Sequence, residues 1–203
     1  FALYGAGEAA KTAKTRSRVT KLSNIIAARY EAYQTRRLPI QIPPGTTDLR
    51  LVAKYRLDAL RDLMRMEMPD RWTDVIDAPA SWTPTPISRP GVTDGYLRKY
   101  NPASTHPNIN LHEAAECLYM IVMNGVGEGA DAREVFRAGD SADTDGDGLP
   151  EFIDGWGKPI YWVRWPVGFK SDLVQMPAGT VFDTLDSQHV YPIALSATVR
   201  TPD

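Results

Sequence analysis

The sequence has little of what marks several protein classes. Its 203 residues contain one cysteine, so an internal disulfide framework is excluded. No run of 18 apolar residues occurs, so no segment of the sequence is predicted to span a bilayer. The net charge of −2 lacks the basic excess of a protein that binds nucleic acid over its whole surface. The hydrophobic content of 43% excludes a disordered chain and predicts one globular domain, with or without an appendage.

Catalytic motifs are also scarce. No nucleophile elbow, P-loop or dinucleotide-binding glycine pattern occurs. Cys117 lies in an apolar run without a basic neighbour, which favours a buried structural thiol over a reactive one. On a helix, His112, Glu113 and Glu116 would resemble the zinc motif H-E-x-x-H with a glutamate as second ligand. The alternative is a first helical turn whose acids the helix dipole stabilises. We therefore predict no catalytic site and no enzyme.

Charge is unevenly distributed. Residues 1–37 contain eight basic residues and only two acidic ones, a net charge of +6. This segment could bind phosphates or an anionic membrane, or it could be an ordinary solvated helix face. Residues 140–154 contain six acidic residues and no Lys or Arg.

The first segment predicts a long helix over residues 8–36, which Pro39 ends. Apolar residues recur at helical spacing on one stripe, namely Val19, Leu22, Ile26, Tyr30 and Tyr33. Before Val19 the stripe fades, because residues 9–18 offer only alanines as apolar positions. This half of the helix must project or pack against something outside the chain.

The remaining chain predicts an α+β head. We expect a stem helix over residues 1–37 and a globular head over 38–203, with a helical middle and a small antiparallel sheet near the carboxyl terminus. Residues 69–107 contain seven prolines and predict a long ordered loop with one short element near Trp72–Ile76. The other expected elements are a helix capped by Asp48 and closed by Pro69, a helix over Leu111–Val126, helical turns over Ala130–Ala138, and strands at Ile160–Trp165 and Val190–Val199.

The acidic segment has the spacing of a calcium loop. From Asp143 it reads DTDGDGLPEFID, with carboxylates at loop positions 1, 3, 5, 9 and 12 and Gly148 at position 6. Ca²⁺ prefers six to eight oxygen ligands, and position 7 can supply a main-chain carbonyl. The predicted ligands are Asp143, Asp145, Asp147, Leu149, Glu151 and Asp154.

This loop departs from the helix–loop–helix pattern in two ways. Position 12 is Asp154 instead of glutamate, which shortens the bidentate reach and predicts weaker binding. No helix can follow, because Gly155, Gly157 and Pro159 break it. The alternatives are a turn without a metal and, on ligand type alone, Mg²⁺ in place of Ca²⁺.

The segment Asp143–Pro159 (DTDGDGLPEFIDGWGKP), followed by Tyr161 and Trp162, resembles the carboxyl-terminal part of type II secretion pseudopilins and related type IV pilin-like proteins. In these, a D-x-W-G-x-P stretch enters the sheet beside a calcium site. The segment KTRSRVTKLSNIIAARYEAYQTRRLPI resembles the outer half of the pilin stem helix. Together with AECLYMIVMNG it is similar to large pilin-like proteins of planctomycetes. Residues 40–110 have no equivalent in small pseudopilins.

The resemblance implies a structural subunit of a pilin-like or pseudopilus-like filament or secretion assembly. Its stripe around Val19–Tyr33, continuing onto the head, would pack against other pilin-like subunits. The implied location is periplasmic or extracellular, with an original membrane anchor. Mature pilins begin with phenylalanine and carry glutamate at the fifth position, whereas Phe1 is followed by Ala2, Leu3, Tyr4 and Gly5. Phe1 is therefore not the pilin amino terminus, so the anchor has been removed or left out, or never existed.

Two other functions remain open. A secreted, calcium-stabilised enzyme or ligand-binding module would use the proline-rich loop and the tryptophans as its site. Trp156, Trp162 and Trp165 cluster in sequence and could stack on a ligand, although packing in the core is the commoner role. A nucleic-acid binder would use the basic helix, and we expect no nucleic-acid partner.

Overall fold

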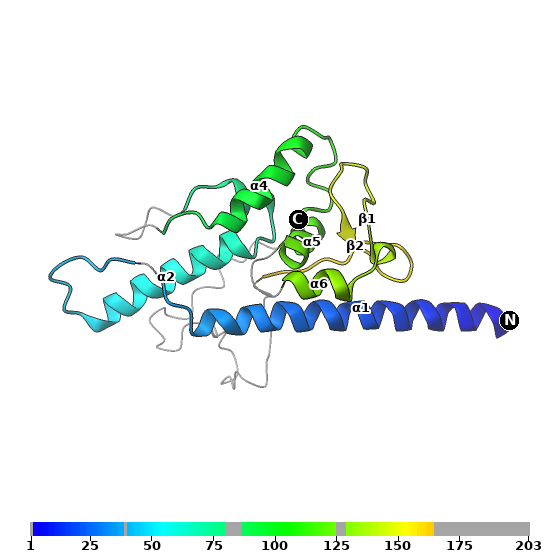
Figure 1. Cartoon of the computed structure of the whole chain (residues 1–203), viewed down its shortest axis with the longest axis horizontal. Coiled ribbons are helices and arrows are strands. Elements are labelled where there is room, and N and C mark those ends of the chain that lie inside the picture. Colours follow the sequence, from blue (N-terminus) through cyan, green and yellow to red (C-terminus); the bar gives the residue numbers. More distant parts are fainter. Residues whose placement is uncertain (1, 39, 80–86, 125–128, 165–203) are drawn as a thin grey trace, which may run out of the picture.

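The computed structural model describes residues 2–38, 40–79, 87–124 and 129–164, and these are mostly helical (Figure 1). The helices are α1 (Ala2–Gln34), α2 (Leu49–Glu67), α3 (Trp72–Ile76), α4 (Gly91–Ala103), α5 (Glu113–Asn124) and α6 (Gly129–Val135). A 3₁₀ turn, η1 (Ala138–Asp140), leads into β1 (Ser141–Ala142), which pairs antiparallel with β2 (Glu151–Phe152). The expected α+β composition with a long amino-terminal helix is confirmed for this part of the chain.

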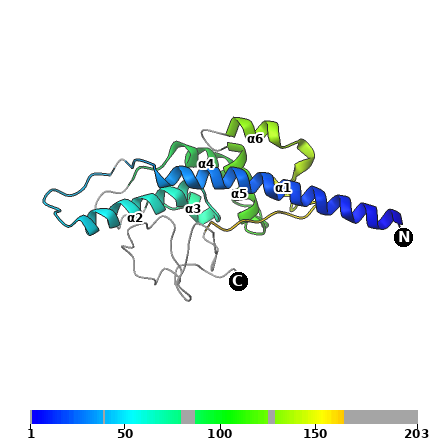
Figure 2. The same cartoon turned by 90° about the horizontal axis from the view of Figure 1, so that it is seen from below.

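Helix α1 extends beyond the rest of the molecule at its amino-terminal end (Figures 1 and 2). Its 33 residues correspond to a length of about 50 Å at 1.5 Å per residue. Residues 5–17 are exposed apart from Glu8 and Thr15, which are half-buried. This agrees with the fading of the apolar stripe before Val19. Among the described helices, none is both long enough and apolar enough to cross a membrane.

The second half of α1 packs on the head of its own chain. Leu22 and Tyr33 are buried there, Ile26 and Tyr30 are partly buried, and Val19 stays 44% exposed. The expectation that this stripe faces neighbouring subunits is therefore wrong for its buried members. They pair with α2 and α5 because these helices present their own apolar faces to α1.

Helix α2 begins as the sequence predicts. The side chain of Asp48 accepts a hydrogen bond from the main-chain N–H of Arg50 at 2.8 Å, which satisfies one of the free donors of the first turn. The buried face of α2 presents Leu63, Met64 and Met66 to the core that contains Tyr33.

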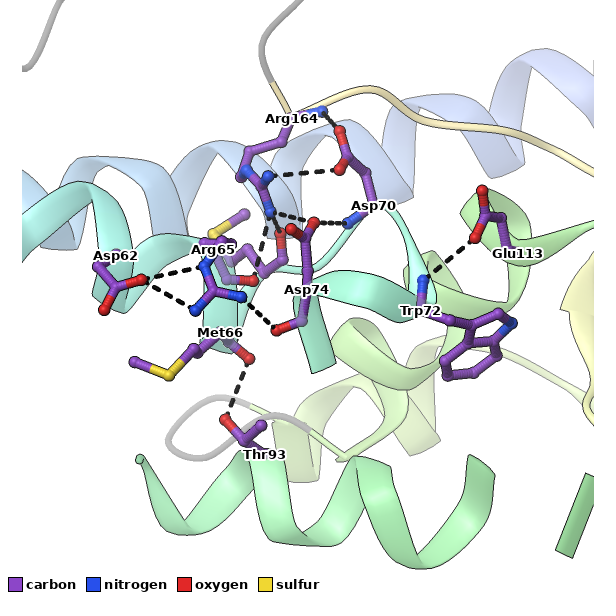
Figure 3. Close-up of polar contacts among 10 residues, drawn as sticks. Asp62, Arg65, Met66, Asp70, Trp72, Asp74, Thr93, Glu113 and Arg164 are labelled. Carbon is purple, nitrogen blue, oxygen red and sulfur yellow. Dashed lines mark hydrogen bonds and ion pairs between the residues drawn. The ribbon is translucent and has the colours of Figure 1, made fainter. Parts of the chain in front are cut away.

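Residues 69–107 are not the long loop that the sequence predicts. The short helix α3 is confirmed, but α4 adds thirteen helical residues beginning directly after Pro90. Polar contacts fix α4 against α2: the Thr93 hydroxyl donates to the Met66 carbonyl at 3.1 Å, and the Tyr96 hydroxyl donates to the Glu67 carbonyl at 3.1 Å. Figure 3 shows the first of these contacts. A search for apolar spacing misses such a helix, and Pro102 within its last turn further disguises it.

Helix α5 occupies the centre of the head, against α4, α6, β2 and α1 (Figure 1). Seven of its residues are buried, including Cys117, and burial raises the pKa of this thiol well above its ordinary value. The prediction of a structural cysteine is confirmed.

The strand predicted at Ile160–Trp165 is not formed by residues 160–164, and Trp165 lies outside the described residues. The Ile160 N–H donates to the Phe152 carbonyl at 2.7 Å, and the segment then leaves the sheet. Its last described residue, Arg164, donates to Asp74 at 2.9 Å and to the Met68 carbonyl at 3.0 Å (Figure 3). This segment is therefore fixed by side-chain contacts and not by the main-chain hydrogen bonds of a strand. The strand predicted at Val190–Val199 lies outside the described residues.

Candidate metal centre

The acidic loop connects β1 to β2, and its own carboxylates shape it. Asp143 accepts the N–H groups of Gly146 (2.7 Å) and Gly148 (3.0 Å), one on each carboxylate oxygen. Asp147 accepts the Leu149 N–H at 2.7 Å through Oδ1. Gly148 has φ of 95°, a conformation that side chains rarely adopt, so glycine is required at this sixth loop position. The turn chemistry inferred from the sequence is thus present.

Two groups of carboxylates converge at this loop. One consists of Asp143, Asp145 and Asp147, and the other of Glu116, Asp145 and Glu151. Within each group, one oxygen from every residue lies within 4.8 Å of the others. Asp145 belongs to both groups and joins them. These clusters could hold a metal ion, and their all-oxygen composition suits a hard cation.

Several oxygens here are buried and have no hydrogen-bond partner. They are Glu116 Oε1 and Oε2, Asp145 Oδ2, Asp147 Oδ2 and Glu151 Oε1. The side chains of Glu116 and Glu151 are wholly inaccessible, at 0% exposure. Buried carboxylates are normally paired, protonated or bound to a metal. The residues therefore fit a cation on an observation independent of their spacing.

The raised pKa values of the cluster also indicate that its carboxylates need a partner of positive charge. Burial raises the pKa of Glu116 to about 9. Asp147, Asp145 and Glu151 add to the shift through their negative charge, and the nearby Trp72 side chain opposes it. Burial raises the pKa of Glu151 to about 7, although the Thr144 N–H donates to it at 2.9 Å. Burial also raises the pKa of Asp147. Each shift reflects carboxylates crowded in a place from which water is excluded.

The structure brings together some of the predicted ligands but not all of them. Asp143, Asp145, Asp147 and Glu151 come together as the spacing predicts. Asp154 belongs to neither group, and its Oδ1 accepts the N–H groups of Trp156 and Lys158, both at 2.8 Å. The Leu149 carbonyl and Asp154 stay predictions as ligands.

Glu116 is the member of the cluster that the loop pattern could not reveal. It lies on α5, 27 residues before the loop. The available signal was an acid inside an otherwise apolar helix. The zinc-like arrangement around it does not form among the described residues: His112 Nδ1 lies 2.5 Å from the Tyr161 hydroxyl, and Glu113 accepts the Trp72 N–H at 3.2 Å (Figure 3).

The stem helix holds the end of the loop. Arg18, 3% exposed, donates to the carbonyls of Ile153 (2.6 Å), Asp154 (2.9 Å) and Gly139 (2.6 Å). Its guanidinium also forms an ion pair with Asp140 at 2.5 Å. Sequence reasoning assigned Arg18 only to the basic segment, because its partners lie more than 120 residues away.

Two further contacts extend this attachment toward the projecting end of α1. The Gly155 N–H donates to the Thr15 hydroxyl at 2.8 Å, and the Trp156 indole N–H donates to Glu8 at 2.9 Å. Trp156 thus packs beside the stem, whereas Trp162 packs against two of the cores. Lys14 and Arg16 stay exposed on the stem.

Comparison with family models, with curated proteins and with solved structures finds no match for this chain. The fold and the site therefore have to be interpreted from their own geometry.

Proposed function

We propose that the protein is a non-enzymatic structural subunit of a pilin-like or pseudopilus-like filament or secretion assembly, with Ca²⁺ in the acidic loop of its head. The single observation that carries the proposal is the division of α1 into a half that packs on the head and a half that extends beyond it (Figures 1 and 2).

The projecting half supports an assembly role because it makes few contacts of its own. Over residues 5–17 its contacts with the head come through the side chains of Glu8 and Thr15 and the main chain of Lys11, and the other residues are exposed. Helices gain most of their stability from tertiary packing, so an unpacked extension is marginal alone and gains from a neighbour. In the proposed assembly, this half packs against the stems of other pilin-like subunits.

The acidic loop supports a stabilising cation. Its ligands are oxygens only, which suits Ca²⁺ and disfavours zinc. Because Arg18 binds the end of the same loop, a cation there would also brace the stem against the head. Loops of this kind with modest affinity work at the millimolar calcium of extracellular fluid. The proposal accordingly includes a periplasmic or extracellular location, with membrane attachment through an anchor outside this sequence.

Photo-crosslinking in the native cells tests the assembly role. A photoreactive amino acid replaces Lys14 on the projecting half, and the matched control replaces Lys99, an exposed lysine of α4. We expect ladders of adducts that contain this chain or other helical-stem subunits from position 14, and far weaker ones from position 99. Monomer alone from position 14, or equal yields from both positions, would contradict the proposal.

Thermal melting tests the calcium role. At calcium 10 to 100 times its Kd, the native state gains about 1.4–2.7 kcal/mol. For a chain of this size we expect the midpoint to rise by roughly 3–10 °C over that in chelator. Asp145→Ala should abolish this rise and melt below the wild type in calcium, because Asp145 belongs to both carboxylate groups. Superimposable wild-type curves in calcium and in chelator would remove calcium from the proposal.

A further inference from the structure

Some ligand oxygens of a regular calcium loop already accept hydrogen bonds in this loop, whereas other carboxylate oxygens nearby accept none. Both oxygens of Asp143 accept main-chain N–H groups, and Oδ1 of Asp154 accepts two. Both oxygens of Glu116, by contrast, are buried without any partner. Asp145 Oδ2, Asp147 Oδ2 and Glu151 Oε1 are buried without a partner as well, and Asp145 and Glu151 form one carboxylate group with Glu116.

We propose that Glu116 of α5 is a direct ligand of the cation, with Asp145, Asp147 and Glu151 as its partners. In this arrangement Glu116 supplies the bidentate contact that a loop of this type takes from its twelfth residue, here Asp154. The cation is a hard divalent ion of the size of Ca²⁺. The inference rests on the calcium part of the proposed function and assigns the ligands that the sequence pattern could not.

The burial of Glu116 is the first argument. A fully inaccessible carboxylate with two unpartnered oxygens destabilises a protein unless a proton or a cation satisfies it. The groups around it are themselves acidic, since Asp145 and Glu151 lie in the same cluster. Repulsion among these carboxylates is relieved when they share a divalent ion.

Distance is the second argument. Ligand oxygens on opposite sides of Ca²⁺ are separated by roughly 4.6–5.2 Å, twice the coordination distance. The chosen oxygens of Glu116, Asp145 and Glu151 all lie within 4.8 Å of one another. One ion can therefore contact all three without a change in the main chain. The second group adds Asp147 Oδ2, which is also buried and unpartnered, whereas both oxygens of Asp143 accept N–H groups.

The position of the ligands determines what the cation would do. Glu116 belongs to the central helix, whereas Asp145 belongs to the loop and is fixed by Asn108, whose side-chain amide donates to the Asp145 carbonyl at 2.7 Å. A shared ion would cross-link the loop to the core of the head. It would not merely close the loop on itself, as a cation bound by Asp143 to Asp154 alone would.

Calorimetric titration of the full chain with calcium chloride tests this assignment. We expect Glu116→Gln to weaken calcium binding at least tenfold and to remove the calcium-dependent rise of the melting midpoint. Glu113→Gln on the same helix and Asp154→Asn at loop position 12 are the matched controls, expected to stay within about threefold of wild type. In chelator, Glu116→Gln should melt no lower than wild type, because an amide replaces an unpaired acid. A residue with only a packing role would lower both midpoints.

The outcomes separate this inference from the proposed function. Wild-type affinity in Glu116→Gln with a large loss in Asp154→Asn overturns the inference and leaves a calcium loop in its usual register. Absence of calcium binding in the wild type overturns this inference and the calcium part of the proposed function, and leaves the assembly role to the crosslinking experiment. Glu116→Asp, which keeps the charge but withdraws the carboxylate by one methylene, is the second variant should the amide misfold. Undiminished affinity in that variant also contradicts direct ligation.

Discussion

Gly155 shows, at the scale of single residues, how closely the loop and the stem approach. A Cβ atom at this position would lie 2.3 Å from the carbonyl oxygen of Lys11 and 2.7 Å from its Cα. Both are main-chain atoms of α1, which cannot rotate away as a flexible side chain could. The glycine is thus required by contact with another element.

Gly155→Ala should therefore loosen the stem from the loop. Overpacking of this kind costs about 1–3 kcal/mol, and we expect a loss in that range in urea unfolding. Hydrogen exchange should also quicken in residues 8–18. Gly139→Ala is the control, because a Cβ there meets nothing within 4 Å. Equal stability of the two variants would contradict the close contact.

Individual site residues were predictable to the extent that they share one segment. The alternating acids of the loop fix their own convergence, so Asp143, Asp145, Asp147 and Glu151 followed from spacing. Glu116 and Arg18 did not, because no local pattern says which distant helix faces a loop. The signal for Glu116 was an acid among the apolar residues of its helix, whereas Arg18 lies in the polar part of α1 and offered none.

Among the elements, the contact between α1 and the turn η1 depends on charge. Burial raises the pKa of Asp140, but hydrogen bonds from the Arg137 N–H and the Arg18 guanidinium, together with the charge of Arg18, outweigh it and lower the pKa below its ordinary value. A lowered pKa stabilises the folded state at pH values above the unfolded pKa, and this stability is lost as the pH falls through the folded value.

Asp140→Asn should accordingly destabilise the protein at pH 7 and less at pH 3. The physical reason is that the unfolded chain takes up the proton at a higher pH than the folded one, so the advantage of the charged form declines as the pH falls below the unfolded pKa. Urea unfolding in chelator across this range measures the difference between the two proteins. Asp94→Asn, an exposed acid of α4, is the control and should change stability by less than about 0.5 kcal/mol throughout. A difference that grows toward pH 3 would contradict the assignment.

The elements themselves were predictable where the apolar spacing is regular. Helices α1, α2 and α5 followed from such spacing, and Asp48 marked the start of α2. Helix α4 did not, because Thr93 and Tyr96 anchor it through hydroxyl groups. Residues 160–164 have the composition of a strand, but Arg164 pairs with the side chains of Asp70, between α2 and α3, and of Asp74 in α3.

For the molecule as a whole, Arg164 joins parts that are distant in sequence. It lies near the end of the described chain and pairs with Asp70 (3.4 Å), between α2 and α3, and with Asp74 (2.9 Å) of α3 (Figure 3). Burial raises the pKa of Asp70, and the charge of Arg164 opposes this shift. The ion pairs thus connect the chain that follows the acidic loop to the region where α2 ends and α3 begins.

Arg164→Ala should destabilise the whole head, because it leaves two carboxylates without their cation. Breaking a largely buried pair of this kind costs about 3–5 kcal/mol. Adding Asp70→Asn and Asp74→Asn should restore part of the loss in denaturant unfolding. Arg89→Ala, which removes exposed contacts to the carbonyls of Ile76 and Asp77, should have a small effect. Comparable losses from the two arginine variants would contradict the role of the buried pair.

The attachment of α1 has a consequence for how the chain acquires its structure during synthesis. The stem leaves the ribosome before the head, yet Arg18 and Thr15 find their partners only when residues 139–155 have emerged. At about 5–20 residues per second, roughly 6–24 s pass between the end of α1 and Gly155. During this interval the apolar side chains of Leu22 and Tyr33 are without much of their final packing. A nascent chain that exposes the apolar face of such a helix for this long is a natural client for a holding chaperone.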